Sequence, residues 1–125
     1  MMKRILIVDD EADCVELLIQ VLGESYEVVG TSDGQEALTL VHSFRPDLVI
    51  TDLGLPGLSG VELARRVRSG TVTAATLVVA FTGSGELSSA DLALFDRFVQ
   101  KPVRIRLLEQ IVAEVLGVPS HAVPT

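Results

Sequence analysis

The chain of 125 residues contains one cysteine, Cys14, and no tryptophan, and only 4% of its residues are aromatic. A single cysteine permits neither an internal disulfide nor a zinc site built from cysteines, which is typical of a reducing compartment. No apolar run approaches the roughly 20 residues that a membrane-spanning helix needs. The apolar stretch Ile5–Val8 is followed directly by Asp9 and Asp10, so we do not interpret it as a signal peptide. We therefore expect a cytoplasmic protein that makes no contact with a membrane.

Basic residues are also scarce: ten Lys and Arg stand against seventeen Asp and Glu, which gives a formal net charge of −7 at pH 7. Binding to a nucleic-acid backbone requires clustered Lys and Arg, so we expect no nucleic-acid binding by this domain. An acidic balance suits a site for a divalent cation, but it equally serves solubility, and charge alone does not choose between the two. With 48% hydrophobic residues, the chain is long enough for one domain with a single well-filled core.

Apolar runs alternate along the chain with segments of helical periodicity. Because five expected strands alternate with five expected helices, we predict an α/β fold in which helices cover both faces of a doubly wound parallel sheet. We expect this domain to span residues 1–117, with residues 118–125 as a flexible tail or the start of a linker. The expected strands are 4–8, 26–30, 47–51, 76–81 and 97–100. The first expected helix is 12–22. The second is opened by the capping box Ser32-x-x-Gln35, and the third, 61–68, is opened by the capping box Ser59-x-x-Glu62. The fourth is a weak helix near 90–94, and the fifth has an apolar stripe from Ile105 to Leu116.

Charged and hydroxyl side chains stand where several of these strands end. The apolar run Leu48–Ile50 leads to Asp52 and then to a turn that contains glycine and proline. The carboxyl ends of parallel strands share one edge of the sheet, and the strands that flank the switch point place ligands there. We therefore expect the side chains at the other strand ends to converge on Asp52: these are Asp9, Asp10, Thr82 and Lys101.

This set of groups predicts phosphoryl chemistry. Three close carboxylates repel one another, and Mg²⁺, which prefers oxygen ligands, would relieve the repulsion. Asp52 is the candidate nucleophile for an acyl-phosphate, and Lys101 would neutralise the phosphoryl oxygens. The hydroxyl of Thr82 could donate a hydrogen bond to a phosphoryl oxygen. Taken singly, an Asp after a strand is more often a cap or turn residue, and Lys101 could be an ordinary surface lysine.

Four short segments carry a resemblance to a known family. They are Ile7-Val8-Asp9-Asp10-Glu11, Asp52-x-x-x-Pro56-x-x-x-Gly60, Thr82-Gly83, and Phe98-x-x-Lys101-Pro102. In this order the chain resembles, over about residues 3–117, a receiver domain of the bacterial response-regulator family, which is CheY-like.

The resemblance implies a sheet of strand order 2-1-3-4-5 and a switch that accepts a phosphoryl group on Asp52. The donor would be the phosphohistidine of a sensor histidine kinase or of a histidine phosphotransfer protein, and the domain would promote only its own phosphorylation and dephosphorylation. Mg²⁺ would be held by Asp10, Asp52 and the backbone carbonyl of Gly54, with Asp9 acting through a water. Thr82 and Phe98 would form the coupled switch pair, and the bond before Pro102 would be cis. From the residues alone, Phe98 is equally well interpreted as a core aromatic.

The chain departs from the family pattern at two points. Small residues stand two positions after Asp52 and Thr82, at Gly54 and Ser84, so the lifetime of the phosphorylated form stays open. Only fifteen residues separate Thr82 from Phe98, so we expect the fourth helix to be short or irregular. This matters because the fourth helix, fifth strand and fifth helix commonly form the output face of receivers.

Two other functions compete with the phosphoacceptor switch. A phosphatase-type enzyme also uses an aspartyl nucleophile, but it usually carries a second Asp two residues later, where this chain has Gly54. A receiver with a degenerate site, acting only as an interaction module, ranks last because every expected site residue is present. We interpret Cys14 as a small structural side chain, His42 and His121 as solvent residues, and Arg65, Arg66 and Arg68 as a solvated helix face.

Overall fold

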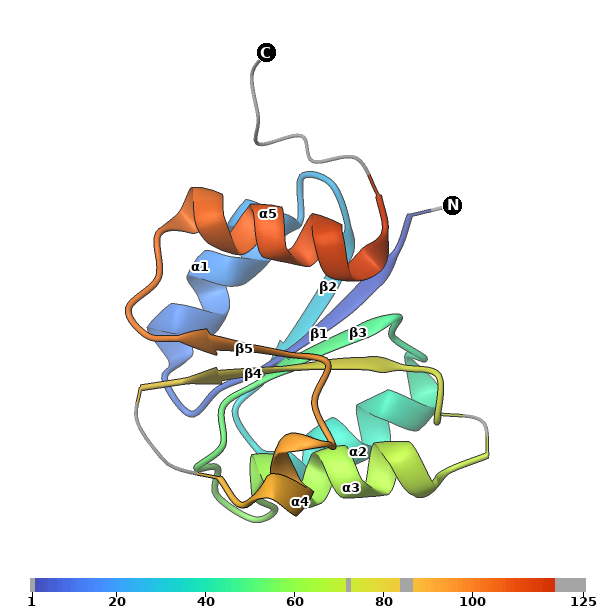
Figure 1. Ribbon diagram of the computed structural model, residues 1–125. Coiled ribbons are helices and arrows are strands. Elements are labelled where there is room, and N and C mark those ends of the chain that lie inside the picture. Colours follow the sequence, from blue (N-terminus) through green and yellow to red (C-terminus); the bar gives the residue numbers. More distant parts are fainter. Residues whose placement is uncertain (1, 72, 84–86, 119–125) are drawn as a thin grey trace.

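The computed structural model describes residues 2–71, 73–83 and 87–118, and in these residues five strands alternate with five helices (Figure 1). The strands are parallel and lie in the order β2-β1-β3-β4-β5, so the predicted doubly wound α/β fold is confirmed. The strands are β1 (Arg4–Val8), β2 (Glu27–Thr31), β3 (Leu48–Thr51), β4 (Leu77–Thr82) and β5 (Arg97–Gln100). The helices are α1 (Ala12–Leu22), α2 (Gly34–Ser43), α3 (Gly60–Ser69), α4 (Ser89–Leu92) and α5 (Ile105–Leu116).

The three central strands of the sheet, β1, β3 and β4, are buried on both faces. Helices α1 and α5 cover one face, and α2, α3 and α4 cover the other (Figure 1). Alternate residues of β1 therefore enter different cores: Ile5 and Ile7 pack with α1 and α5, whereas Leu6 and Val8 pack with α2 and α3. All four residues of β3 are buried, which explains why the central strands are apolar at successive positions. No helix in the described ranges combines the length and the apolar character that a membrane crossing requires.

The start of α2 corrects one prediction. The expected cap, Ser32, does not cap the helix; Asp33 does, and its Oδ1 accepts a hydrogen bond from the Gln35 amide at 2.8 Å. Strand β2 continues to Thr31, one residue beyond the expected end, which leaves Asp33 in the extended conformation directly before the first helical turn. Asp caps a helix as well as Ser does, so the sequence pattern could not separate the two.

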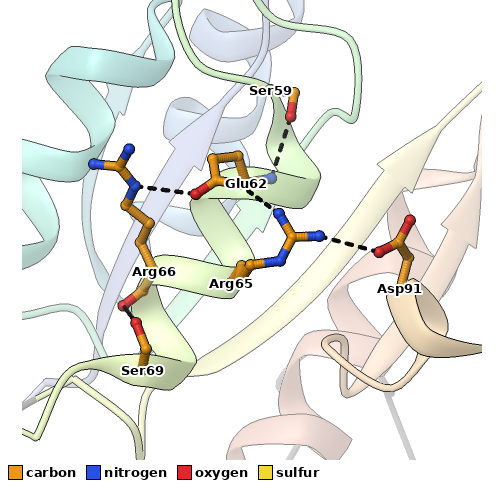
Figure 2. A network of polar contacts seen from close by, with 6 residues as sticks. All are labelled: Ser59, Glu62, Arg65, Arg66, Ser69 and Asp91. Carbon is orange, nitrogen blue, oxygen red and sulfur yellow. Dashed lines mark hydrogen bonds and ion pairs between the residues drawn. The ribbon is translucent and has the colours of Figure 1, made fainter.

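Helix α3 starts as predicted, and a surface network joins it to α4 (Figure 2). The Ser59 hydroxyl accepts a hydrogen bond from the Glu62 amide at 3.2 Å. The Glu62 carboxylate accepts hydrogen bonds from Arg66 and Arg65, which lower its pKa. Arg65 also reaches Asp91 of α4 at 3.3 Å. Exposed ion pairs of this kind add little to stability, so the network links α3 to α4 more than it stabilises the fold.

Arg68 corrects another prediction, since it does not lie on a solvated face. Its guanidinium donates to the carbonyls of Thr76 at 2.8 Å and Leu94 at 3.0 Å, and it pairs with Asp96. These carbonyls belong to the segments that enter β4 and β5. Arg68 therefore anchors α3 to the part of the chain between α4 and β5.

The fourth helix is short, as predicted, and this determines the surroundings of Phe98. Helix α4 has only four residues and does not cover β5, which is an edge strand. The side chain of Phe98 on β5 is therefore 41% exposed. Its ring contacts the buried Phe95, with 5.3 Å between the ring centroids. The interpretation of Phe98 as an ordinary core residue is therefore wrong.

The chain continues past α5 through a left-handed residue, Gly117, with φ of 67°. The amide of Val118 donates to the Ala113 carbonyl at 3.0 Å, and the Val118 side chain packs against the core. The rest of the expected tail, residues 119–125, lies outside the described residues.

Candidate functional site

Backbone hydrogen bonds carry the candidate residues to one edge of the sheet. The amide of Asp9 donates to the Thr31 carbonyl at 3.2 Å, and that of Asp52 donates to the Val8 carbonyl at 2.8 Å. The amide of Lys101 donates to the Thr82 carbonyl at 2.8 Å. The parallel ladder thus extends one residue beyond the ends of β1, β3 and β5, and it aligns these residues next to the end of β4. The predicted convergence at the carboxyl edge is what the structure shows.

Asp9 is the buried acid of the group, with 1% of its surface exposed. Its Oδ2 accepts a hydrogen bond from Lys101 Nζ at 2.6 Å, and its Oδ1 accepts one from the Glu11 amide at 3.0 Å. A carboxylate is expensive to bury without a charged or hydrogen-bonding partner. The ammonium of Lys101 and the amide of Glu11 therefore supply the partners that this buried carboxylate needs.

Asp52 lies beside Asp9 and shares its ammonium partner. Its Oδ2 accepts a hydrogen bond from Lys101 Nζ at 3.2 Å, and its Oδ1 accepts one from the Leu53 amide at 2.7 Å. Its side chain keeps 18% of its surface exposed, so the carboxylate is reachable from solvent. Asp52 is thus held in one orientation and is open on one side.

Gly60 explains how the loop after Asp52 is packed. A Cβ at position 60 would lie 2.1 Å from the carbonyl oxygen of Asp52 and 2.9 Å from Cα of Leu53. Only glycine lets the first turn of α3 approach this backbone so closely. The Gly60 amide also donates to the Leu53 carbonyl at 2.9 Å, which fixes the loop that carries Asp52.

Asp10 completes a cluster of three acids. One carboxylate oxygen from each of Asp9, Asp10 and Asp52 lies within 4.8 Å of the others. Asp10 is exposed, Asp52 is half-buried and Asp9 is buried, so the cluster opens from the core toward solvent. A donor set made only of oxygens is the kind that Mg²⁺ prefers.

Lys101 is the cation of the site. Burial alone would lower its pKa, but the hydrogen bonds and negative charges of Asp9 and Asp52 outweigh burial and raise the pKa above its ordinary value. The side chain therefore stays an ammonium at neutral pH. Its Nζ also lies over the ring of Phe81, at 5.1 Å from the ring centroid. The bond from Lys101 to Pro102 is cis.

Phe81 is a neighbour of Lys101 in the site that the sequence did not predict. The apolar pattern of β4 marks it only as a strand residue. The available signal was an aromatic residue directly before Thr82, at the end of a strand that leads into the site.

Thr82 is the last residue of β4 and is half-buried at the edge of the site. In the register of β4 and β5, Thr82 pairs with Gln100 and Ala80 pairs with Phe98. Because side chains alternate along a strand, Thr82 and Phe98 lie on the same face of the sheet, one diagonal step apart. The predicted switch pair is therefore adjacent in space. Ser84 lies outside the described residues.

Cys14 of α1 borders the site next to Asp9. Burial and the adjacent Asp9 raise the pKa of its thiol to about 11. The thiol is therefore neutral at physiological pH, and only the thiolate is reactive.

Comparison with known proteins identifies related sequences. Residues 5–113 match the family model described as the response regulator receiver domain. The chain is 36% identical over 105 residues to the DNA-binding response regulator MtrA of Mycolicibacterium paratuberculosis, covering 83% of this chain and 47% of that protein. It is also 36% identical over 110 residues to the phosphate regulon regulatory protein PhoB of Pseudomonas aeruginosa, covering 85% and 48%. The chain thus spans about half the length of these curated relatives.

Solved structures agree with the fold. A putative response regulator from Chloroflexus aurantiacus superposes with a TM-score of 0.84 at 32% identity, covering 94% of this chain and 99% of that one. The receiver domain of a sensor histidine kinase from Pseudomonas aeruginosa superposes with a TM-score of 0.83 at 22% identity, covering 94% and 99%. That crystal structure is described with a magnesium ion coordinated in its active site cleft.

Proposed function

Because the chain belongs to the family of response regulator receiver domains, which are CheY-like, non-enzymatic modules of two-component signalling, we propose that it is a phosphoacceptor switch with Asp52 as its phosphorylated residue. One observation carries the proposal: a single ammonium, that of Lys101, binds both the buried Asp9 and the accessible Asp52. A nucleophilic carboxylate next to a fixed cation is the arrangement that transfer of a phosphoryl group to aspartate requires.

Each residue has a role in the proposed transfer. An oxygen of Asp52 attacks the phosphorus of a phosphohistidine, forming the acyl-phosphate bond as the bond from phosphorus to nitrogen breaks. Lys101 neutralises negative charge on the transferred group, and the Thr82 hydroxyl donates a hydrogen bond to one of its oxygens. Receiver domains have histidine kinases as partners, and we propose that a sensor histidine kinase or a histidine phosphotransfer protein supplies the phosphoryl group here.

We propose that Mg²⁺ is the cofactor. The fit rests on the donor set, in which three carboxylates offer oxygens within 4.8 Å of one another. Asp10, Asp52 and the backbone carbonyl of Gly54 would hold the ion, with Asp9 acting through a water. When bound, the ion supplies positive charge beside the phosphoryl oxygens. The magnesium described in the receiver of the Pseudomonas kinase supports this assignment.

The competing functions have less support. A phosphatase-type enzyme would need a general acid at position 54, and glycine has no acidic side chain that could donate a proton. Nucleic-acid binding by this domain has no support in the net charge of −7, and the DNA binding named for MtrA belongs to that whole protein. We propose that residues 1–117 form the receiver domain, against which Val118 packs, and that the rest of residues 118–125 is a tail or linker.

The function is tested with the wild-type protein and acetyl phosphate, a small acyl-phosphate donor. We expect a mass increase of one phosphate in the presence of Mg²⁺ and none when the ion is removed with EDTA. A protein that stays unlabelled at millimolar Mg²⁺ would contradict the proposal and would favour the degenerate receiver.

Mg²⁺ is expected to raise the melting temperature of the unphosphorylated protein. An ion that binds the folded state stabilises it, by about 2.7 kcal/mol when its concentration is 100 times the dissociation constant. It also relieves the repulsion among Asp9, Asp10 and Asp52. Differential scanning fluorimetry with and without millimolar Mg²⁺ measures the shift, and Asp10→Ala should remove most of it. Asp13→Ala, which lies outside the cluster, should leave it intact; an unchanged melting temperature for the wild type would argue against a metal site.

Thr82→Ala is expected to accept phosphate on Asp52 but to fail to transmit the change. If the Thr82 hydroxyl moves toward the phosphoryl group, it vacates space on the sheet face that it shares with Phe98. The exposed ring of Phe98 can fill that space, which alters the surface formed by α4, β5 and α5. NMR shift maps of wild type and variant, each with and without beryllofluoride, report the change. Equal perturbation around Phe98 in both proteins would show that Thr82 is not the coupling residue.

A further inference from the structure

Lys101 has a third partner besides its two carboxylates. Its Nζ lies 2.6 Å from Asp9, 3.2 Å from Asp52 and 5.1 Å from the centroid of the Phe81 ring. Phe81 is 6% exposed and packs in the core between the sheet and helices α1 and α5. The ring and the lysine also line an open pocket of about 220 Å³, together with Cys14 and Leu108. Phe81 is thus a fixed aromatic surface beneath a flexible side chain.

We propose that Phe81 is a positioning residue for Lys101: its ring face holds the ammonium between Asp9 and Asp52. The effect on phosphoryl transfer rests on the proposed function, but the positioning does not. An aromatic face carries partial negative charge and attracts an ammonium, most strongly when water is excluded. The Lys101 side chain is only 19% exposed, so this contact is largely desolvated.

The Phe81 ring differs from Asp9 and Asp52, the other partners of Lys101, because a metal ion does not compete with the ammonium for it. A divalent cation at the acid cluster would take oxygens of the same carboxylates that now bind Lys101. A hard cation that prefers oxygen does not compete for the face of a phenyl ring. Phe81 therefore keeps the ammonium of Lys101 in the site when the carboxylates of Asp9 and Asp52 bind a divalent cation. A lysine held only by Asp9 and Asp52 would lose one partner or both, and its flexible stem would let it swing toward solvent.

The sequence makes this contact directly measurable, because the chain has only two lysines, Lys3 and Lys101. In protein labelled with ¹³C-lysine, free of metal and of phosphoryl donor, the ε-methylene protons of Lys101 should shift upfield of those of the exposed Lys3 by the ring current. Phe81→Met keeps an apolar side chain of similar size and should abolish the difference. Phe81→Tyr keeps the ring and should preserve it. Phe95→Met, which replaces an equally buried ring in the other core, should also preserve it.

The same variants test the consequence for phosphorylation. Labelling by acetyl phosphate should slow roughly fivefold in Phe81→Met, the effect of losing one cation–π contact, and should recover in Phe81→Tyr. Where the wild type is labelled, equal labelling rates in Phe81→Met and Phe81→Tyr would overturn the effect of Phe81 on phosphorylation.

The lysine spectrum separates this inference from the proposed function, since it requires neither Mg²⁺ nor phosphorylation. If Phe81→Met does not fold, the wild-type spectrum alone decides. Coincident methylene shifts for Lys3 and Lys101 would overturn the positioning role, whatever the outcome of Asp52 labelling.

Discussion

Asp52→Asn is expected to abolish phosphorylation by acetyl phosphate. The amide has the shape of the carboxylate, and its oxygen can still accept the hydrogen bond that Leu53 donates to Asp52 Oδ1. It lacks the negative charge that makes the carboxylate a nucleophile. Intact-mass spectrometry should therefore find no added phosphate on the variant under conditions that label the wild type. Peptide mapping of the wild type should place the phosphate on Asp52.

A control separates loss of the nucleophile from loss of charge. Asp13→Asn removes one exposed carboxylate from the first turn of α1 and should be labelled at the wild-type rate. Circular dichroism of both variants establishes that they are folded. Phosphate found on another residue, or an Asp52→Asn protein labelled as fast as the wild type, would disprove the assignment of Asp52.

Lys101→Met is expected to slow phosphorylation of Asp52 roughly hundredfold or more, which is the typical cost of removing one group that stabilises developing charge. Methionine keeps an apolar stem against Phe81 and removes the ammonium. Because Lys101 occupies oxygens of Asp9 and Asp52, its removal should at the same time strengthen binding of Mg²⁺. Labelling rates and Mg²⁺ titrations measure the two effects, which point in opposite directions.

The same substitution should lower the free energy of unfolding by about 2 kcal/mol. Removing one partner of a fully buried ion pair costs about 3–5 kcal/mol, and we expect less here because Lys101 keeps some contact with solvent. The pKa of Lys101 is higher in the folded protein than in the unfolded chain. Its contribution is therefore fully present below the unfolded value of 10.5 and is lost as the pH rises through the folded value. Denaturant unfolding should give the same difference at neutral pH as at moderately alkaline pH.

Lys3→Met is the matched control, since Lys3 is the other lysine of the chain and lies outside the acid cluster. It should leave labelling, Mg²⁺ binding and stability unchanged. A Lys101→Met protein that is phosphorylated as fast as Lys3→Met would exclude Lys101 from the transfer. Weaker Mg²⁺ binding by Lys101→Met would contradict the competition between the ammonium and the metal.

The sequence by itself determined the fold and which charged side chains meet at the site. Apolar runs such as Ile5–Val8 and Leu48–Ile50, alternating with helical segments, predict parallel strands buried on both faces, and parallel strands bring their carboxyl ends to one edge. That rule alone places Asp9, Asp52 and Lys101 at the same edge of the sheet. It works because backbone pairing is regular: the ladder that joins Val8 to Thr51 also fixes the residues that follow them.

Only the tertiary structure decided the features that depend on side chains from different elements. Ser32 and Asp33 are equivalent as helix caps, and the choice followed from how far β2 runs along β1. The spacing of Arg68 suits the polar face of α3, yet the carbonyls that it binds come from Thr76 and Leu94, on other parts of the chain. The length of α4 left Phe98 uncovered, and the packing of β4 beside β5 brought the Phe81 ring to Lys101. A local sequence pattern shows which face of a helix or strand is apolar. The contacts of Asp33, Arg68, Phe98 and Phe81 depend instead on how separate elements pack together, and no single segment of sequence determines that packing.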